Sequence, residues 1–185
     1  HFMLKEIFEQ PKALKNTLRI DERGLIEVCK ILSECDRIVF TSAGTSFYAG
    51  LCGKYFLANI ARTRSDAVIA SEFDEIMKNV IDDRTTVVAI SQSGETSDTI
   101  SAAKYAKRFG AKIISISNTV GSSLTRLSDA TVYTQAGPEI GVAATKTFLV
   151  QLGVLSIISS KLAEFKGVIS REEYKNLLND LNSIP

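Results

Sequence analysis

Five short apolar segments alternate with helical patterns along this chain, and that alternation limits its possible folds more than any other feature. The segments lie at 37–41, 66–70, 85–90, 112–117 and 130–134. Most are apolar throughout, as in strands covered on both faces. Helical patterns lie at about 46–61, 71–80, 97–109 and 121–128, and a long one at 143–165. This order predicts an α/β fold, with a five-stranded parallel, doubly wound sheet in three α/β/α layers.

An N-terminal arm and two further helical segments flank this alternation. Residues 1–20 are expected to form a partly helical linker arm, interrupted or restarted at Pro11. The segment 22–34 has apolar residues at the i, i+3, i+4, i+7 spacing of an amphipathic helix. The segment 170–185 is expected to be a helix whose packing partner lies outside the chain. We therefore predict one domain, at 21–169.

The charge balance and residue usage of the chain exclude several classes of function. Lysine plus arginine number 22 and aspartate plus glutamate 21, so no strong overall field attracts nucleic acid or an anionic membrane. His1 is the only histidine, which argues against three-histidine metal sites and Ser-His-Asp catalysis. We predict no metal, no cofactor and no catalytic residue in this chain.

The expected location is the cytoplasm. We expect no apolar run that approaches the roughly 20 residues needed to span a bilayer, and the first residues lack the pattern of a signal peptide. The three cysteines, Cys29, Cys35 and Cys52, are an odd number within helical patterns, which fits a reducing compartment better than a disulfide framework.

Ligands of open parallel sheets bind beyond the carboxyl ends of the strands, and the loop at 91–96 carries the strongest signal there. Ser91, Ser93 and Thr96 follow a buried strand, with Gly94 between them and a helix expected to begin near Thr96. Three hydroxyl groups, backbone N–H groups and a helix N-terminus can together hold a phosphate without a basic residue. The alternative is that these residues only form a turn and cap the helix.

Other loops at the same edge carry weaker signals. Gly44 before Thr45 and Ser46 could serve only the turn into the next helix, and the loop at 136–146 could be either a ligand contact or a long helix cap. The loop at 118–123 is expected to be structural. Glu95 and Glu139 resemble general bases, but a carboxylate repels a bound phosphate, so Glu95 is expected to point away and pair locally. Neither a dinucleotide-binding G-x-G-x-x-G nor a Walker A loop is present.

The sequence Ser-Gln-Ser-Gly-Glu-Thr at 91–96, with Gly-Thr-Ser at 44–46, resembles the sugar isomerase (SIS) domain family. Three more segments, at 1–11, 70–73 and 139–146, resemble the first of two such domains in glutamine–fructose-6-phosphate aminotransferases. The resemblance covers nearly the whole chain. It implies a flavodoxin-like topology and a site for fructose 6-phosphate or glucosamine 6-phosphate. The implied contacts to the sugar phosphate are Thr45, Ser46, Ser91, Gln92, Ser93, Thr96, Val142, Ala143 and Ala144.

The chain also departs from that family. Ala144 and Ala43 stand where the family usually has serine and cysteine, so a side-chain contact to the sugar is lost at Ala144. The resemblance implies that the glutaminase domain, the second SIS domain and the family's catalytic glutamate, histidine and lysine are expected outside the given sequence. The resemblance therefore implies a fragment that binds sugar phosphate, pairs as a homodimer and is inactive alone, with 170–185 beginning a linker. The alternatives are a stand-alone isomerase, such as a 6-phospho-3-hexuloisomerase, and a non-catalytic sugar-phosphate sensor.

Overall fold

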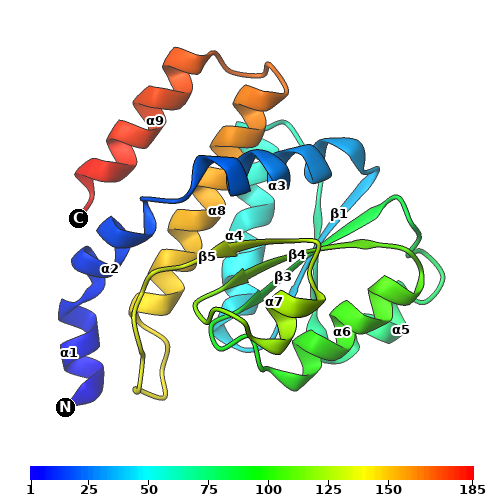
Figure 1. Cartoon of the computed structure of the whole chain (residues 1–185), viewed down its shortest axis with the longest axis horizontal. Coiled ribbons are helices and arrows are strands. Elements are labelled where there is room, and N and C mark those ends of the chain that lie inside the picture. The colour runs from blue at the N-terminus through cyan, green and yellow to red at the C-terminus, as the bar shows by residue number, and fades with distance from the viewer.

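A computed structural model describes all residues, 1–185, and its centre is a five-stranded parallel sheet (Figure 1). The strand order is β2-β1-β3-β4-β5, the flavodoxin-like order of doubly wound folds. The strands are β1 (Arg37–Ser42), β2 (Asp66–Ile69), β3 (Thr85–Ser91), β4 (Lys112–Ser117) and β5 (Ala130–Tyr133). The predicted fold class and all five predicted strands are confirmed.

Helices cover both faces of this sheet. They are α1 (Phe2–Phe8), α2 (Gln10–Thr17), α3 (Glu22–Glu34), α4 (Thr45–Ile60), α5 (Phe73–Met77), α6 (Ser97–Arg108), α7 (Ser123–Leu127), α8 (Lys146–Phe165) and α9 (Arg171–Ser183), with a 3-10 turn η1 (Ala70–Glu72). One core cluster joins the sheet to α3, α4 and α8, and a second joins it to α5, α6 and α7.

The strand residues divide between these two clusters by alternation. Phe40 and Val88 enter the cluster beneath α4 and α8, whereas their neighbours Val39 and Val87 enter the cluster beneath α6. All seven residues of β3 are buried, because it lies in the middle of the sheet with a helix layer on each side.

Two predicted helices differ from those observed. The helix expected at 71–80 is shorter, since η1 precedes an α5 that ends at Met77. The helix expected from residue 143 begins at Lys146, because side chains hold the preceding loop in a non-helical path.

The central helix α8 also corrects an expectation about membranes. By length and composition this helix could cross a bilayer, so a sufficiently apolar segment does exist in the chain. However, 67% of its most apolar window is buried inside the fold, as in the core helix of a globular domain. Gly153 of α8 lies against Leu14 of α2, so the arm covers part of this helix.

The helix α9 packs within the chain, which corrects the expectation of an external partner. Its Tyr174 is buried, and the ammonium group of Lys161 on α8 lies 4.9 Å from the centre of that ring. Leu178 and Leu181 pack against the core cluster that contains α3 and α8. The apolar stripe of α9 therefore packs against elements of this chain, with Tyr174 buried and both leucines half-buried.

Candidate functional site

The strand order places the loops after β1 and β3 beside each other. These two strands are neighbours in the sheet, yet the chain leaves β1 toward β2 on one side and β3 toward β4 on the other. Such a switch point opens a crevice at the carboxyl edge of a parallel sheet. The predicted phosphate-binding loop 91–96 and the segment 42–46 both start there.

The hydroxyl groups of the 91–96 loop form a compact set. Ser91 Oγ and Thr96 Oγ1 lie 2.9 Å apart, and the Gly94 N–H donates to Ser91 Oγ at 3.0 Å. The Glu95 N–H donates to Ser93 Oγ at 3.1 Å, which leaves the hydroxyl proton of Ser93 free for a ligand. The amides of Gly94 and Glu95 are therefore engaged by side chains of the loop, so these two backbone N–H groups are not free donors.

Thr96 is the N-cap residue of α6, but its side chain makes no capping hydrogen bond. Its hydroxyl contacts Ser91 instead. Because no side chain caps this end, the first N–H groups of α6 remain available to an anion. The geometry thus differs from the simple helix cap that was the alternative interpretation of this loop.

The 118–123 segment supports the loop from behind, in agreement with the structural role expected for it. The Asn118 N–H donates to the Gln92 carbonyl at 3.1 Å, and the Leu124 N–H to the Gly94 carbonyl at 3.0 Å. Gly94 has a φ of +67°, and a Cβ there would lie 2.0 Å from Ser122 Oγ. Only glycine therefore fits this turn without movement.

Glu95 pairs locally, as predicted. Its Oε1 accepts a hydrogen bond from the Ser123 N–H at 2.8 Å. Hydrogen bonding from Ser123 holds the pKa of Glu95 below its usual value. The carboxylate is thus engaged with the supporting segment.

The segment after β1 turns through Gly44, whose φ is +56°, directly into α4. Thr45 is exposed at the first position of that helix, and Ser46 is half-buried. The Ser46 hydroxyl accepts a hydrogen bond from Gln151 Nε2 of α8 at 3.0 Å. Gln151 therefore connects α8 to the start of α4.

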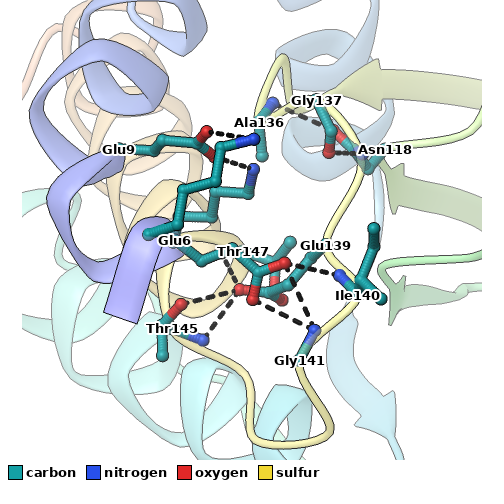
Figure 2. Close-up of polar contacts among 12 residues, drawn as sticks. Glu6, Glu9, Asn118, Ala136, Gly137, Glu139, Ile140, Gly141, Thr145 and Thr147 are labelled. Atoms are coloured by element: carbon teal, nitrogen blue, oxygen red, sulfur yellow. Dashed lines mark hydrogen bonds and ion pairs between the residues drawn. The ribbon is translucent and has the colours of Figure 1, made fainter. Parts of the chain in front are cut away.

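Glu139 organises the loop between β5 and α8. It accepts hydrogen bonds from the Thr145 N–H and hydroxyl, both at 2.9 Å, and from the Thr147 hydroxyl (Figure 2). Burial raises the pKa of Glu139, but the hydrogen bonds from Thr147 and Thr145 outweigh it and leave that pKa below its usual value. Glu139 therefore stabilises the loop as a hydrogen-bonded carboxylate and is not free to act as a general base.

The same loop is attached to the arm and to β4. Glu6 of α1 accepts from the Ile140 N–H at 2.6 Å, and Lys146 Nζ lies 2.6 Å from Glu9 Oε2. Asn118 accepts from the Ala136 N–H at 2.9 Å through Oδ1 and donates to the Gly137 carbonyl at 2.8 Å through Nδ2 (Figure 2). The loop is therefore held at several points.

The structure brings only some of the predicted site residues together. Thr45, Ser46, Ser91, Ser93 and Thr96 lie on the two adjacent loops of the switch point.

Gln92 lines an open cavity of about 800 Å³ together with Asn118 and Glu139. The segment 142–144 does not line that cavity. It is the tip of its loop, with Val142 and Ala143 exposed and Ala144 half-buried. No group of three or more histidine, cysteine, aspartate or glutamate side chains is placed to hold a metal ion.

Asn118, the first residue after β4, has the structural role expected for the 118–123 loop. Two other residues that hold these loops were not predicted. Glu6 and Gln151 lie within helices far along the chain from their partners, and no local pattern marked them.

Comparison with known proteins gives consistent matches over this chain. A family model described as SIS domain matches residues 31–159. A glutamine–fructose-6-phosphate aminotransferase (isomerizing) of Thermococcus kodakarensis is 44% identical over the whole chain, and one of Thermotoga maritima is 45% identical over the whole chain. The chain spans 31% of the length of each of these two relatives, so it corresponds to about a third of such proteins.

A solved structure is similar over the full chain. It is the C-terminal domain of a glucosamine–fructose-6-phosphate aminotransferase of Francisella tularensis, with a TM-score of 0.91 and 36% identity. The match covers 100% of this chain and 53% of that one.

Proposed function

This chain belongs to the SIS domain family, and we propose that it binds a phosphorylated sugar, fructose 6-phosphate, at the switch point of its sheet. The main observation in support is that Ser91 Oγ and Thr96 Oγ1 lie 2.9 Å apart at the N-terminus of α6, which no side chain caps. Hydroxyl and N–H donors at a helix N-terminus match the geometry of a phosphate dianion. Homology to the SIS domain of the aminotransferases supports the choice of sugar phosphate.

The proposed contacts to the phosphate are Thr45, Ser46, Ser91, Gln92, Ser93 and Thr96. Those to the sugar are backbone groups of Val142, Ala143 and Ala144. The supporting observations are the position of the first set at the switch point and the position of the second set at a loop tip, where Val142 and Ala143 are exposed. Ala144 offers no side-chain hydrogen bond to the sugar, since it lacks a hydroxyl group.

Titration of the ¹⁵N-labelled chain with fructose 6-phosphate, followed by amide chemical shifts, tests this site. A Ser93→Ala/Thr96→Ala variant should bind at least tenfold more weakly, because hydrogen bonds to a charged group contribute about 1.5–3 kcal/mol each. Ser101→Ala, an exposed hydroxyl loss further along α6, is the matched control. Absence of shifts in the 91–96 loop, or equal affinities of the parent and the double variant, would contradict the proposal.

We propose that this chain performs no turnover by itself. Its one histidine is exposed at position 1, and Glu139 is engaged in hydrogen bonds within its loop. General acid–base catalysis needs an ionisable group within reach of the substrate. Formation of glucosamine 6-phosphate by this chain from fructose 6-phosphate and ammonia would contradict the proposal. An isomerase assay on phosphorylated hexuloses tests the alternative of a stand-alone isomerase.

The remaining proposals concern organisation and partners. We propose an arm at 1–20, a binding domain at 21–169 and a helix that starts a linker at 170–185. We further propose a cytoplasmic homodimer that binds neither nucleic acid nor membrane. The near-neutral charge supports the proposed absence of nucleic-acid and membrane binding. The exposed Phe2, Leu4 and Phe8 of α1 support self-association. Light scattering after gel filtration measures the oligomeric state.

A further inference from the structure

We propose that α1 is a clamp for the sugar-contacting loop, and that Glu6 is its positioning residue. The inference rests on the proposed function, because it concerns how the segment 142–144 is held ready for a sugar. Glu6 lies 134 residues before Ile140 along the chain, yet its carboxylate directly contacts the backbone of the loop.

The Glu6 side chain is buried on an otherwise exposed helix, with 3% of its surface accessible. Its Oε1 accepts from the Ile140 N–H at 2.6 Å, and both of its oxygens lie near the Gly141 N–H, at 3.2 and 3.1 Å. A buried carboxylate is costly unless hydrogen bonds compensate for the lost water. Here those bonds come from the loop, so burial of Glu6 and the path of the loop depend on each other.

One turn further along the arm, Glu9 makes the second attachment. Its carboxylate pairs at 2.6 Å with Lys146, whose ammonium group is almost completely buried at the start of α8. Along the chain the two attachments flank the segment 142–144, with Ile140 and Gly141 before it and Lys146 after it. The segment 142–144 therefore lies between two positions that contacts with the arm hold in place.

Gly141 makes the first attachment possible. A Cβ at this position would lie 2.5 Å from Glu6 Oε2, closer than such atoms approach one another. Any larger residue at 141 would displace the Glu6 carboxylate from the N–H groups of Ile140 and Gly141. Gly141→Ala therefore disturbs the same contact as a change at Glu6, from the opposite side.

The consequence for binding follows from backbone entropy. Contacts through the backbone of 142–144 require that segment to adopt one path, and ordering each residue costs conformational entropy. A loop already fixed by α1 avoids part of that cost when a sugar binds. The phosphate site at 91–96 lies on another loop and does not touch Glu6, so the clamp should affect the sugar and not the phosphate.

The test uses the full chain in four forms: the parent, Glu6→Ala, Glu6→Gln and Gly141→Ala. Each is titrated with fructose 6-phosphate and, separately, with inorganic phosphate. Glu6→Ala should weaken fructose 6-phosphate binding about tenfold and inorganic phosphate binding less than twofold. Glu6→Gln keeps one carbonyl oxygen as an acceptor and should retain most of the affinity. Glu27→Ala, the same change at an exposed helical position without hydrogen bonds, is the control.

Hydrogen exchange supplies a readout that does not depend on ligand. Glu6→Ala should accelerate exchange of the Ile140 and Gly141 amides and of 142–144, with no change in 91–96. In the double variant Glu6→Ala/Gly141→Ala, exchange of these amides should be no faster than in either single variant, because both substitutions remove the same contact.

Unchanged exchange in the loop, or equal weakening of both ligands, would overturn the clamp. Failure of the folded parent to bind either ligand would instead overturn the proposed function, and the exchange data would still decide whether α1 holds the loop.

Discussion

Gln151 of α8 donates its Nε2–H to the hydroxyl oxygen of Ser46 at the start of α4, at 3.0 Å. Because that oxygen accepts a hydrogen bond, its own proton is free to be donated elsewhere. The buried amide thus prepares Ser46 as a donor at the switch point. The Oε1 atom of Gln151 is buried without a hydrogen-bond partner, which lowers the stability of the fold.

Gln151→Met should therefore weaken phosphate and fructose 6-phosphate binding to a similar degree, by about threefold to tenfold, since one oriented hydrogen bond is lost. Methionine has a similar volume, so the free energy of unfolding should change by less than about 1.5 kcal/mol. Chemical-shift titration measures the affinities. In a Ser46→Ala background the same substitution should have no further effect, and additive losses would show that Gln151 acts elsewhere.

Gly94 offers a test of the packing behind the phosphate-binding loop. Gly94→Ala should destabilise the chain by about 3 kcal/mol, because it combines a left-handed backbone with a clash against Ser122. Gly121→Ala is the matched control, since its φ is +70° with nothing within 4 Å of the added Cβ. It should cost about 1 kcal/mol. Urea unfolding measures both changes in the free energy of unfolding. Equal changes would mean that the Ser122 side chain can move aside at little cost.

The fold was predictable from sequence because its signals are local. Each strand is a short apolar segment, and 112–117 matches β4 residue for residue. The 91–96 loop was equally visible, since a buried strand, a glycine and a new helix follow one another directly. Buried parallel strands show this pattern because both of their faces are covered.

The long-range contacts that hold the 136–146 loop and the start of α4 were not predictable in this way. Glu6 and Ile140 are separated by 134 residues, and Gln151 and Ser46 by 105. A single glutamate or glutamine in a helical pattern has the composition of an ordinary exposed side chain. The late start of α8 has a local cause, because Glu139 accepts hydrogen bonds from Thr145, six residues further on, and holds residues that would otherwise continue the helix.

The thiol groups report on the packing of α3 independently of any ligand. Burial raises the pKa of Cys29 to about 12, and its side chain has no exposed surface. Cys52 and Cys35 are half-buried. Brief labelling with iodoacetamide at pH 8 should therefore modify Cys29 last, because the thiolate is the reactive form.

Mass spectrometry of the labelled chain gives the order. In urea sufficient to unfold the chain, all three cysteines should react at similar rates. Early modification of Cys29 in the absence of urea would show that α3 opens without global unfolding.

Glu139 makes the stability of the chain dependent on pH in a defined direction. Its pKa in the folded chain lies below the ordinary value of 4.5, since hydrogen bonds from Thr147 and Thr145 outweigh the effect of burial. The folded state therefore favours the carboxylate, and this contribution is complete above about pH 5. It declines as pH falls through 4.5 and is lost once the folded-state pKa is passed.

Glu139→Gln should remove this dependence, because the amide does not titrate. The parent should be more stable than the variant at pH 7, and the difference in free energy of unfolding should shrink between pH 5 and pH 3. Urea unfolding at several pH values measures that difference, with Glu27→Gln as the control for an exposed glutamate. A difference that stays constant with pH would mean that the carboxylate charge does not hold the loop, and that the shape of the side chain alone does.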